Sequence, residues 1–214
     1  TGSNSAAASD AENDCKAIAG YTGEGSGVAK CVAGKYKALT TAAACTDCDA
    51  GTYKADEAQD AAADCDACPD TTNSVSAAGS DAISDCLAKA GYTGSGASVA
   101  ECEKGKFKAT AADAAACTNC DAGKFKAAVA QTSAAACEAC PVNSVSPAAS
   151  DANTDCSCNS GWSGPNGDAC VKECGTGQKR NGAVCENCGA GTYKTGTDTA
   201  TSCSDCPDNS DSPA

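Results

Sequence analysis

The sequence predicts a small disulfide-rich fold, in which tandem cysteine-rich repeats with short β-hairpins and little other regular secondary structure form an elongated rod. Three observations predict it: 20 of the 214 residues are Cys, these cysteines recur periodically, and large apolar side chains are rare. Most of the hydrophobic fraction is Ala and Cys, and Ala buries too little apolar surface to offset the conformational entropy lost on folding. Disulfides or metals must therefore supply the missing stability.

Cysteine usage and charge limit where the chain works and what it contacts. Glutathione keeps cytosolic thiols reduced, so this cysteine density indicates a secreted protein in an extracellular or cell-surface location. The formal net charge of −13 and the absence of His argue against nucleic acid and anionic membrane surfaces as partners. No apolar run reaches 18 residues, so this segment is not expected to insert into a membrane. Because the chain begins at Thr1 with no leader, we expect a segment of a longer protein.

Six cysteines recur with a period of about 71 residues. They predict three repeats, at residues 1–69, 70–141 and 142–207, with residues 208–214 as the start of a further repeat. Ser9-Asp10-Ala11 in the first copy returns as Ser80-Asp81-Ala82 and Ser150-Asp151-Ala152 in the other two. The matching cysteines are Cys15, Cys31, Cys45, Cys48, Cys65 and Cys68 in the first copy, Cys86, Cys102, Cys117, Cys120, Cys137 and Cys140 in the second, and Cys156, Cys174, Cys185, Cys188, Cys203 and Cys206 in the third.

Two additional cysteines in the third copy, Cys158 and Cys170, suggest how the others pair. The first two copies have Ala at both matching positions, and cysteines that are absent together are best explained as bonded partners. If each cysteine bonds its next neighbour, the pairs are Cys31–Cys45, Cys48–Cys65, Cys68–Cys86, Cys102–Cys117, Cys120–Cys137, Cys140–Cys156, Cys158–Cys170, Cys174–Cys185 and Cys188–Cys203. Cys15 and Cys206 are then expected to pair outside the segment. Spacing leaves interlaced pairing of neighbouring Cys-x-x-Cys motifs open.

Five segments read Gly-x-aromatic-Lys shortly after a cysteine, at residues 34–37, 51–54, 105–108, 123–126 and 191–194. Gly permits a turn with positive φ and the following residues suit a short strand, so each segment predicts half of a small hairpin. A sixth place, Gly177-Gln178-Lys179, lacks the aromatic residue. Each ring is expected to pack on its own disulfide. The Ala-rich stretches 41–44, 61–63, 110–116 and 133–136 favour single helical turns.

The pattern Cys-x-x-Cys-x-x-Gly-x-Tyr/Phe-Lys, followed by a polar loop and Cys-x-x-Cys-Pro, resembles the ephrin-receptor-like cysteine repeat, with kinship to tumour-necrosis-factor-receptor modules. Residues 45–69, 117–141 and 185–207 carry it. Residues 156–174 resemble the last third of an epidermal-growth-factor-like module, whose final two cysteines pair. The resemblance implies elongated, extracellular, disulfide-laddered modules, as in receptors, protist surface antigens and algal cell-surface or flagellar-hair proteins. It does not fix a ligand.

Other chemistry fits the sequence less well. Two sets of four cysteines match a zinc template, but zinc would leave Cys15, Cys31, Cys86 and Cys102 unexplained. No His is present to act as a general base, so we do not expect an enzyme. No cofactor is expected; calcium is the alternative at the carboxylate pairs, for which a solvated turn is favoured. The zinc sets are Cys45, Cys48, Cys65 and Cys68, and Cys117, Cys120, Cys137 and Cys140; the carboxylate pairs are Asp10 and Asp14, Asp81 and Asp85, and Asp151 and Asp155.

The function predicted from these features is structural: a repeat segment of a larger cell-surface coat, stalk or filament, such as a flagellar hair. Its partners would be other copies or neighbouring subunits of an extracellular assembly. The alternative is a receptor or adhesin ectodomain that binds a protein or glycan. Binding surfaces are rich in Arg and aromatic residues, and here every aromatic residue occupies a repeat slot, which favours the structural role. The single Arg, Arg180, with Lys179 and Trp162, makes the third copy the place to expect contacts.

Overall fold

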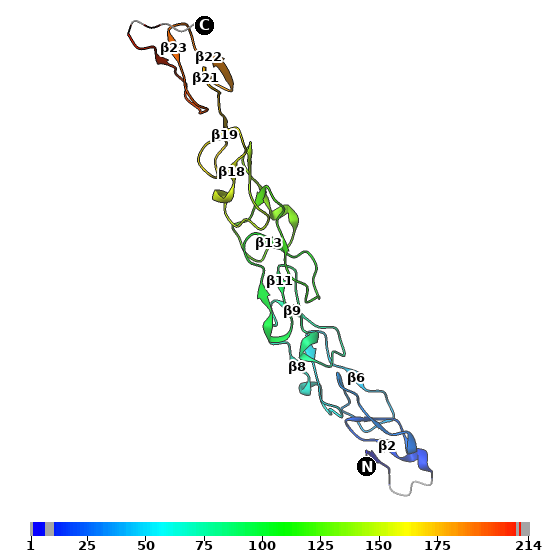
Figure 1. The fold of residues 1–214 in the computed structure, drawn as a ribbon. Helices are drawn as coiled ribbons and strands as arrows, with labels where there is room; N and C mark the ends of the chain where they lie inside the picture. Colours follow the sequence, from blue (N-terminus) through cyan, green and yellow to red (C-terminus); the bar gives the residue numbers. More distant parts are fainter. Residues whose placement is uncertain (1, 7–10, 209, 211–214) are drawn as a thin grey trace. The chain divides into compact units, whose positions relative to one another are not determined.

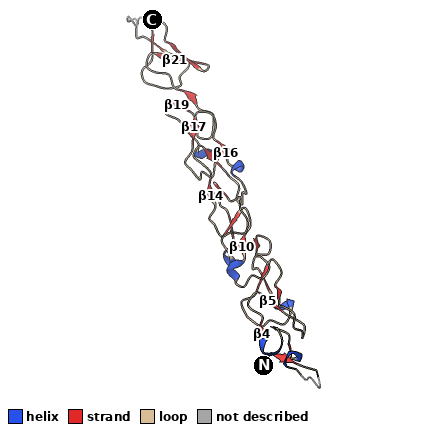
Figure 2. Cartoon of the chain, turned by 90° about the vertical axis from the view of Figure 1, so that its right-hand side faces the viewer, coloured by secondary structure: helices blue, strands red, loops and turns tan. Residues whose placement is uncertain are grey.

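The computed structural model describes residues 2–6, 11–208 and 210, and its regular secondary structure is short throughout (Figures 1 and 2). All strands are two residues long except β21 (Gln178–Asn181) and β22 (Val184–Asn187), which form the longest hairpin. Among the described residues there is no α-helix. The prediction of a small disulfide-rich fold built from short hairpins is confirmed.

Each sheet in the described part of the chain has two strands, and the pairs named below as hairpins are antiparallel. The hairpins are β1 (Ser3–Asn4) with β2 (Lys16–Ala17), β3 (Tyr21–Thr22) with β4 (Ala29–Lys30), β5 (Lys35–Tyr36) with β6 (Thr46–Asp47), β7 (Thr52–Tyr53) with β8 (Asp66–Ala67), β9 (Ser74–Val75) with β10 (Leu87–Ala88), β11 (Tyr92–Thr93) with β12 (Ala100–Glu101), β15 (Lys124–Phe125) with β16 (Glu138–Ala139), β17 (Ser144–Val145) with β18 (Ser157–Cys158), β19 (Trp162–Ser163) with β20 (Val171–Lys172), and β23 (Thr192–Tyr193) with β24 (Ser204–Asp205). Two further strands are β13 (Lys106–Phe107) and β14 (Thr118–Asn119).

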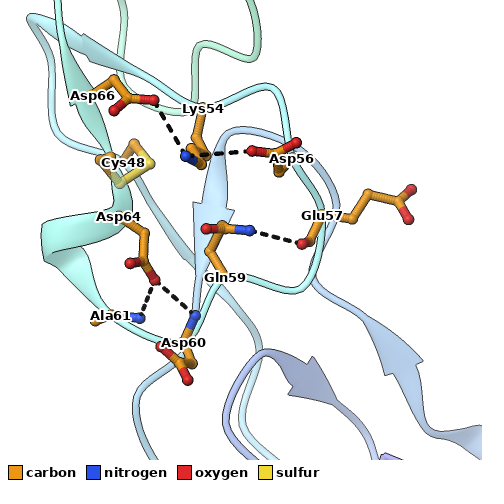
Figure 3. A network of polar contacts seen from close by, with 10 residues as sticks. Cys48, Lys54, Asp56, Glu57, Gln59, Asp60, Ala61, Asp64 and Asp66 are labelled. Atoms are coloured by element: carbon orange, nitrogen blue, oxygen red, sulfur yellow. Dashed lines mark hydrogen bonds and ion pairs between the residues drawn. A yellow bond between two sulfur atoms is a disulfide. The ribbon is translucent and has the colours of Figure 1, made fainter.

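Single 3₁₀ turns lie between strands, at η1 (Glu12–Asp14), η2 (Gly25–Gly27), η3 (Ala62–Asp64), η4 (Ile83–Asp85), η5 (Gly96–Ser98), η6 (Ala134–Ala136) and η7 (Asn153–Asp155). In η3 the carboxylate of Asp64 accepts the N–H groups of Asp60 and Ala61 at 3.1 and 2.9 Å, which caps the turn (Figure 3). The predicted helical turns therefore occur as 3₁₀ turns that overlap 61–63 and 133–136. They are wrong for 41–44 and 110–116, which have no helical turn; so short a segment does not hold a helix by propensity alone.

The chain divides into two compact units. The first comprises Thr1–Cys102, Phe107–Thr118 and Ala130–Ser133, and the second Glu103–Lys106, Asn119–Val129 and Ala134–Ala214. The repeat boundaries at residues 69, 141 and 207 and the elongated shape stay predictions.

Half-cystines form the core of both units. In the first, Cys31, Cys48, Cys86 and Cys102 are fully buried, and Ala17 and Ala88 are the buried aliphatic residues; in the second, Cys120, Cys156 and Cys174 take this place. Every described aromatic ring is at least partly exposed. The packing of each ring on its own disulfide stays a prediction. The chain is thus stabilised by covalent loops, as its lack of large apolar residues requires.

Candidate interaction site at the hairpin junctions

Nine disulfides join the nine pairs that nearest-neighbour bonding predicts, including Cys158 with Cys170. Their Cα–Cα distances are 5.5–5.9 Å and their sequence separations 11–18 residues, which are ordinary values for disulfides. Cys15 and Cys206 are free and half-buried in this chain; their pairing with cysteines outside the segment stays a prediction.

The disulfides also bear on the zinc alternative. All eight cysteines of the two zinc templates are bonded to another cysteine, for example Cys45 to Cys31 and Cys68 to Cys86, so none is free as a thiolate ligand. Within the described part of the chain, no cluster of three or more His, Cys, Asp or Glu residues could hold a metal ion.

Successive hairpins are joined through their backbones at the Gly-x-aromatic-Lys segments. The N–H of the glycine in one hairpin donates to the carbonyl of the lysine in the next, as Gly34 does to Lys54 at 2.8 Å. The glycine carbonyl in turn accepts the N–H of a cysteine, here Cys48 at 2.8 Å. The same glycine-to-lysine bond joins Gly20 to Lys37, Gly91 to Lys108, Gly105 to Lys126 and Gly177 to Lys194, at 2.8–2.9 Å. We call each of these contacts a junction.

At some junctions a serine takes the place of the lysine. The N–H of Gly51 donates to the carbonyl of Ser76 and that of Gly123 to Ser146, at 3.1 and 2.8 Å. Both serines are buried, and the hydroxyl of Ser146 donates to the Lys124 carbonyl at 2.9 Å. The serine carbonyl therefore accepts the junction hydrogen bond, as the lysine carbonyl does elsewhere, although the serine side chain is shorter.

Three junction lysines are buried, a feature that sequence reasoning missed. The exposed fractions of Lys37, Lys108 and Lys194 are 4%, 3% and 8%. The ammonium group of Lys37 donates to the carbonyls of Tyr21 and Thr41, and burial lowers the pKa of Lys37. The signal in the sequence was the recurrence of Lys, rather than of varied polar residues, at five of the six slots.

The ammonium groups of the other two buried lysines each contact both a backbone carbonyl and a carboxylate. Lys108 lies 2.9 Å from the carboxylate of Asp113 and also donates to its carbonyl. Hydrogen bonds from the Thr110 hydroxyl and from Lys108 lower the pKa of Asp113 to about 2. Lys194 donates to the Cys174 carbonyl at 3.0 Å and pairs with Asp198, also at 3.0 Å.

The more exposed Lys54 has a different set of partners (Figure 3). It pairs with Asp66 at 3.2 Å and Asp56 at 3.4 Å. The hydrogen bond to Asp66 is the main reason that the pKa of Lys54 is raised. Lysines in these slots are thus placed to hold neighbouring loops together.

The junction pattern changes in the third repeat. Arg180 occupies the place of Lys37 and Lys108, yet in the described structure no hydrogen bond joins Gly161 to Arg180 as Gly20 is joined to Lys37. The carbonyl of Gly161 instead accepts the N–H of Glu173 at 3.0 Å, one residue earlier than the cysteine used in the other copies. The Nε of Arg180 donates to the Gly182 carbonyl of its own hairpin at 2.8 Å.

This change accompanies a hollow of about 350 Å³ between the β19–β20 and β21–β22 hairpins. We call it the third-repeat groove; it is lined by Trp162, Cys170, Val171, Lys172, Arg180 and Ala183. Trp162 lies directly opposite Lys172 across its hairpin. The structure therefore brings together two of the residues expected to make contacts in the third copy, Trp162 and Arg180.

Residues 34–86 match the family model described as tyrosine-protein kinase ephrin type A/B receptor-like. The expected resemblance is confirmed for this part of the chain. The match contains the predicted segment 45–69, begins 11 residues earlier and ends at Cys86. The segments 117–141 and 185–207 lie outside it. The likeness of residues 156–174 to an epidermal-growth-factor-like module stays a prediction. No curated protein matches the chain.

Cysteine-rich modules of the ephrin-receptor-like kind are non-catalytic and extracellular. Together with the nine disulfides, the match indicates an extracellular or cell-surface location and a structural or ligand-binding role. None of the helical segments in the described part is long and apolar enough to span a membrane.

A second hollow, of about 450 Å³, adjoins the C-terminal end of the ephrin-receptor-like module. Its lining includes Val75, Leu87 and Ala112, with Asp85 as the charged member. The Asp85 carboxylate accepts the N–H groups of Asp81 and Ala82 at 3.1 and 3.0 Å, so it is engaged in capping η4.

The predicted carboxylate pairs thus serve as turn caps where the structure describes them. Asp155 caps η7 as Asp85 caps η4, by accepting the N–H groups of Asp151 and Ala152 at 3.0 Å each. In the first copy Asp14 accepts the N–H of Ala11 at 3.2 Å, whereas Asp10 lies outside the described residues.

Proposed function

We propose that the chain is a structural repeat segment of an extracellular coat, stalk or filament, for example a flagellar hair. The observation that carries the proposal is the recurrence of the glycine-to-lysine junction along the chain. This bond uses backbone groups, and it recurs from Gly20 to Gly177. Such a contact joins one module to the next in the same way along the chain. A dedicated binding protein instead concentrates aromatic and Arg residues at one surface.

The disulfides give this role a physical basis. Each closes a loop of 11–18 residues, so tension on the chain can straighten only the few residues between loops. Breaking the backbone bonds of a junction leaves the covalent loops closed. A segment built in this way resists extension without a large apolar core.

Immunogold electron microscopy of intact cells that make the protein tests the proposal. An antibody raised against the disulfide-bonded segment should label a coat or filament at the cell surface. Label confined to the cell interior would contradict the proposal. In solution, small-angle scattering should give a radius of gyration well above the value of about 17 Å for a compact chain of this length.

A receptor or adhesin role is the second candidate, and one observation favours it. The third-repeat groove joins an indole ring with two cations, Lys172 and Arg180, and such residues anchor interfaces. Label spread evenly over the plasma membrane, with no coat or filament marked, would favour this second role.

A further inference from the structure

We propose that the third-repeat groove binds an acidic turn on a second copy of this chain. The inference rests on the proposed structural function and names the surface through which copies would meet. It starts from the place of Arg180, where the described structure lacks the glycine-to-lysine bond that Gly20 and Gly91 form in the other two copies. Lys37 and Lys108 are buried at their junctions, whereas Arg180 is partly exposed and lines a hollow.

The cations of the groove lack the carboxylate partners that most described lysines have. Eight lysines form ion pairs: Lys16, Lys30, Lys35, Lys54, Lys106, Lys108, Lys126 and Lys194. In the described structure no ion pair includes Lys172, Lys179 or Arg180. Glu186, which lies across the β21–β22 hairpin from Lys179, instead accepts a hydrogen bond from Asn181 at 2.7 Å. Lys172 and Arg180 therefore line the groove with Trp162, and neither is neutralised by an ion pair within the described part of the chain.

Charge complementarity selects the occupant. The chain has 28 acidic and 15 basic residues and a net charge of −13, so the surface of a second copy offers carboxylates far more often than cations. Opposite charges at a contact raise the association rate and set its orientation. The carboxylates of an acidic turn on another copy would pair with the two cations, and its aliphatic atoms would pack on the indole face.

Apolar side chains flank the groove as well. Val142, whose carbonyl accepts the N–H of the lining residue Cys170, is 71% exposed, and Val184, next to Ala183, is 57% exposed. A turn seated between them would remove apolar surface from water and strengthen the charge contacts. Since the groove and an acidic turn are different surfaces, the contact is heterologous and can extend to further copies.

Trp162 is the only Trp of the chain, so its fluorescence reports on the groove in the unmodified protein. We would measure sedimentation velocity, Trp emission and acrylamide quenching over a range of protein concentrations at low salt. The expected result is concentration-dependent association, accompanied by a blue shift of the emission and reduced quenching. Raising the salt to about 0.5 M should weaken association, because exposed charges are then screened.

Charge reversal locates the contact. Arg180→Glu should weaken association at least about tenfold, a loss of about 1.4 kcal/mol. Lys104→Glu is the matched control: it makes the same charge change at an exposed residue outside the groove and should associate like the parent. Disulfide mapping of each variant verifies that it is folded.

Three results would overturn the proposal. The first is a chain that remains monomeric at every concentration. The second is association without any change in Trp emission, which would place the contact elsewhere but leave the structural function standing. The third is a monomer whose Trp emission shifts on adding polygalacturonate fragments, which would make the groove a glycan site and favour the adhesin role.

Discussion

Pulling the chain by its two ends should yield far less extension with the disulfides intact than after reduction. Between Cys31 and Cys203 the nine disulfides bridge about 135 of the 172 Cα-to-Cα steps of the backbone, and about 37 steps lie between the loops. A pulling force that breaks every hydrogen bond still does not extend the residues inside each loop, because the disulfide carries the force.

The size of the difference follows from chain geometry. An extended residue spans about 3.5 Å, so the backbone between the loops reaches about 130 Å. The nine disulfides each add about 5.7 Å between their Cα atoms, which brings the total to about 180 Å. The fully reduced stretch reaches about 600 Å. Reduction should therefore lengthen the molecule by about 420 Å, whatever the residues outside Cys31 and Cys203 contribute.

Single-molecule force spectroscopy with and without a thiol reductant measures this gain. A variant with Cys158 and Cys170 both changed to Ala should gain only about 35 Å in the non-reduced state, since it releases one loop. It should also remain folded, because the other two repeats have Ala at these positions. Extension by several hundred ångströms without reductant would refute the pairing, and it is the outcome expected if metal ions held the cysteines.

Three further predictions concern the junctions. Gly34→Ala should lower the free energy of unfolding by at least about 3 kcal/mol and Gly51→Ala by about 1–2. Both glycines have positive φ, but only the Cβ at Gly34 would meet a backbone oxygen, that of Gly79 at 2.2 Å. Equal losses in guanidinium titrations would contradict the close approach of the Gly79 carbonyl to Gly34. Lys194→Met should lower that free energy by about 2–3 kcal/mol, because its partners lose a buried donor, and a change below about 0.5 would show that the lysine only fills space. The lowered pKa of Asp113 means that its contribution is complete above pH 4 and lost toward pH 2; the melting temperatures of the parent and Asp113→Asn should therefore converge over this range, and a constant difference would contradict the assignment.

The disulfide pairs were accessible from the sequence because covalent constraints repeat with the chain. The joint replacement of Cys158 and Cys170 by Ala in the other copies suggested one pair, and even spacing suggested the rest. The short hairpins followed from the five segments in which a glycine and an aromatic residue come shortly after a cysteine. Both inferences use local information, and local information suffices when loops close over fewer than twenty residues.

The buried lysines and the groove depend on contacts between hairpins, which the sequence expresses only weakly. Lys is normally exposed. Lys37 can be buried because its ammonium group donates hydrogen bonds to backbone carbonyls. Trp162 and Arg180 were noted as residues at which to expect contacts, but the groove that they line lies beside a one-residue shift in a backbone hydrogen bond. The cysteine spacing and the repeat slots do not predict this shift.

The junction between hairpins has a consequence for how the chain can change over generations. Every residue except proline supplies a backbone N–H, and every residue supplies a carbonyl, so the Gly34 to Lys54 type of bond requires little of the loops on either side. After a module is duplicated or deleted, the modules that become neighbours still present the same backbone donor and acceptor to each other. The Ala, Ser, Thr and Asp content of the loops can then change, and modules can be gained or lost, without loss of the junction bond.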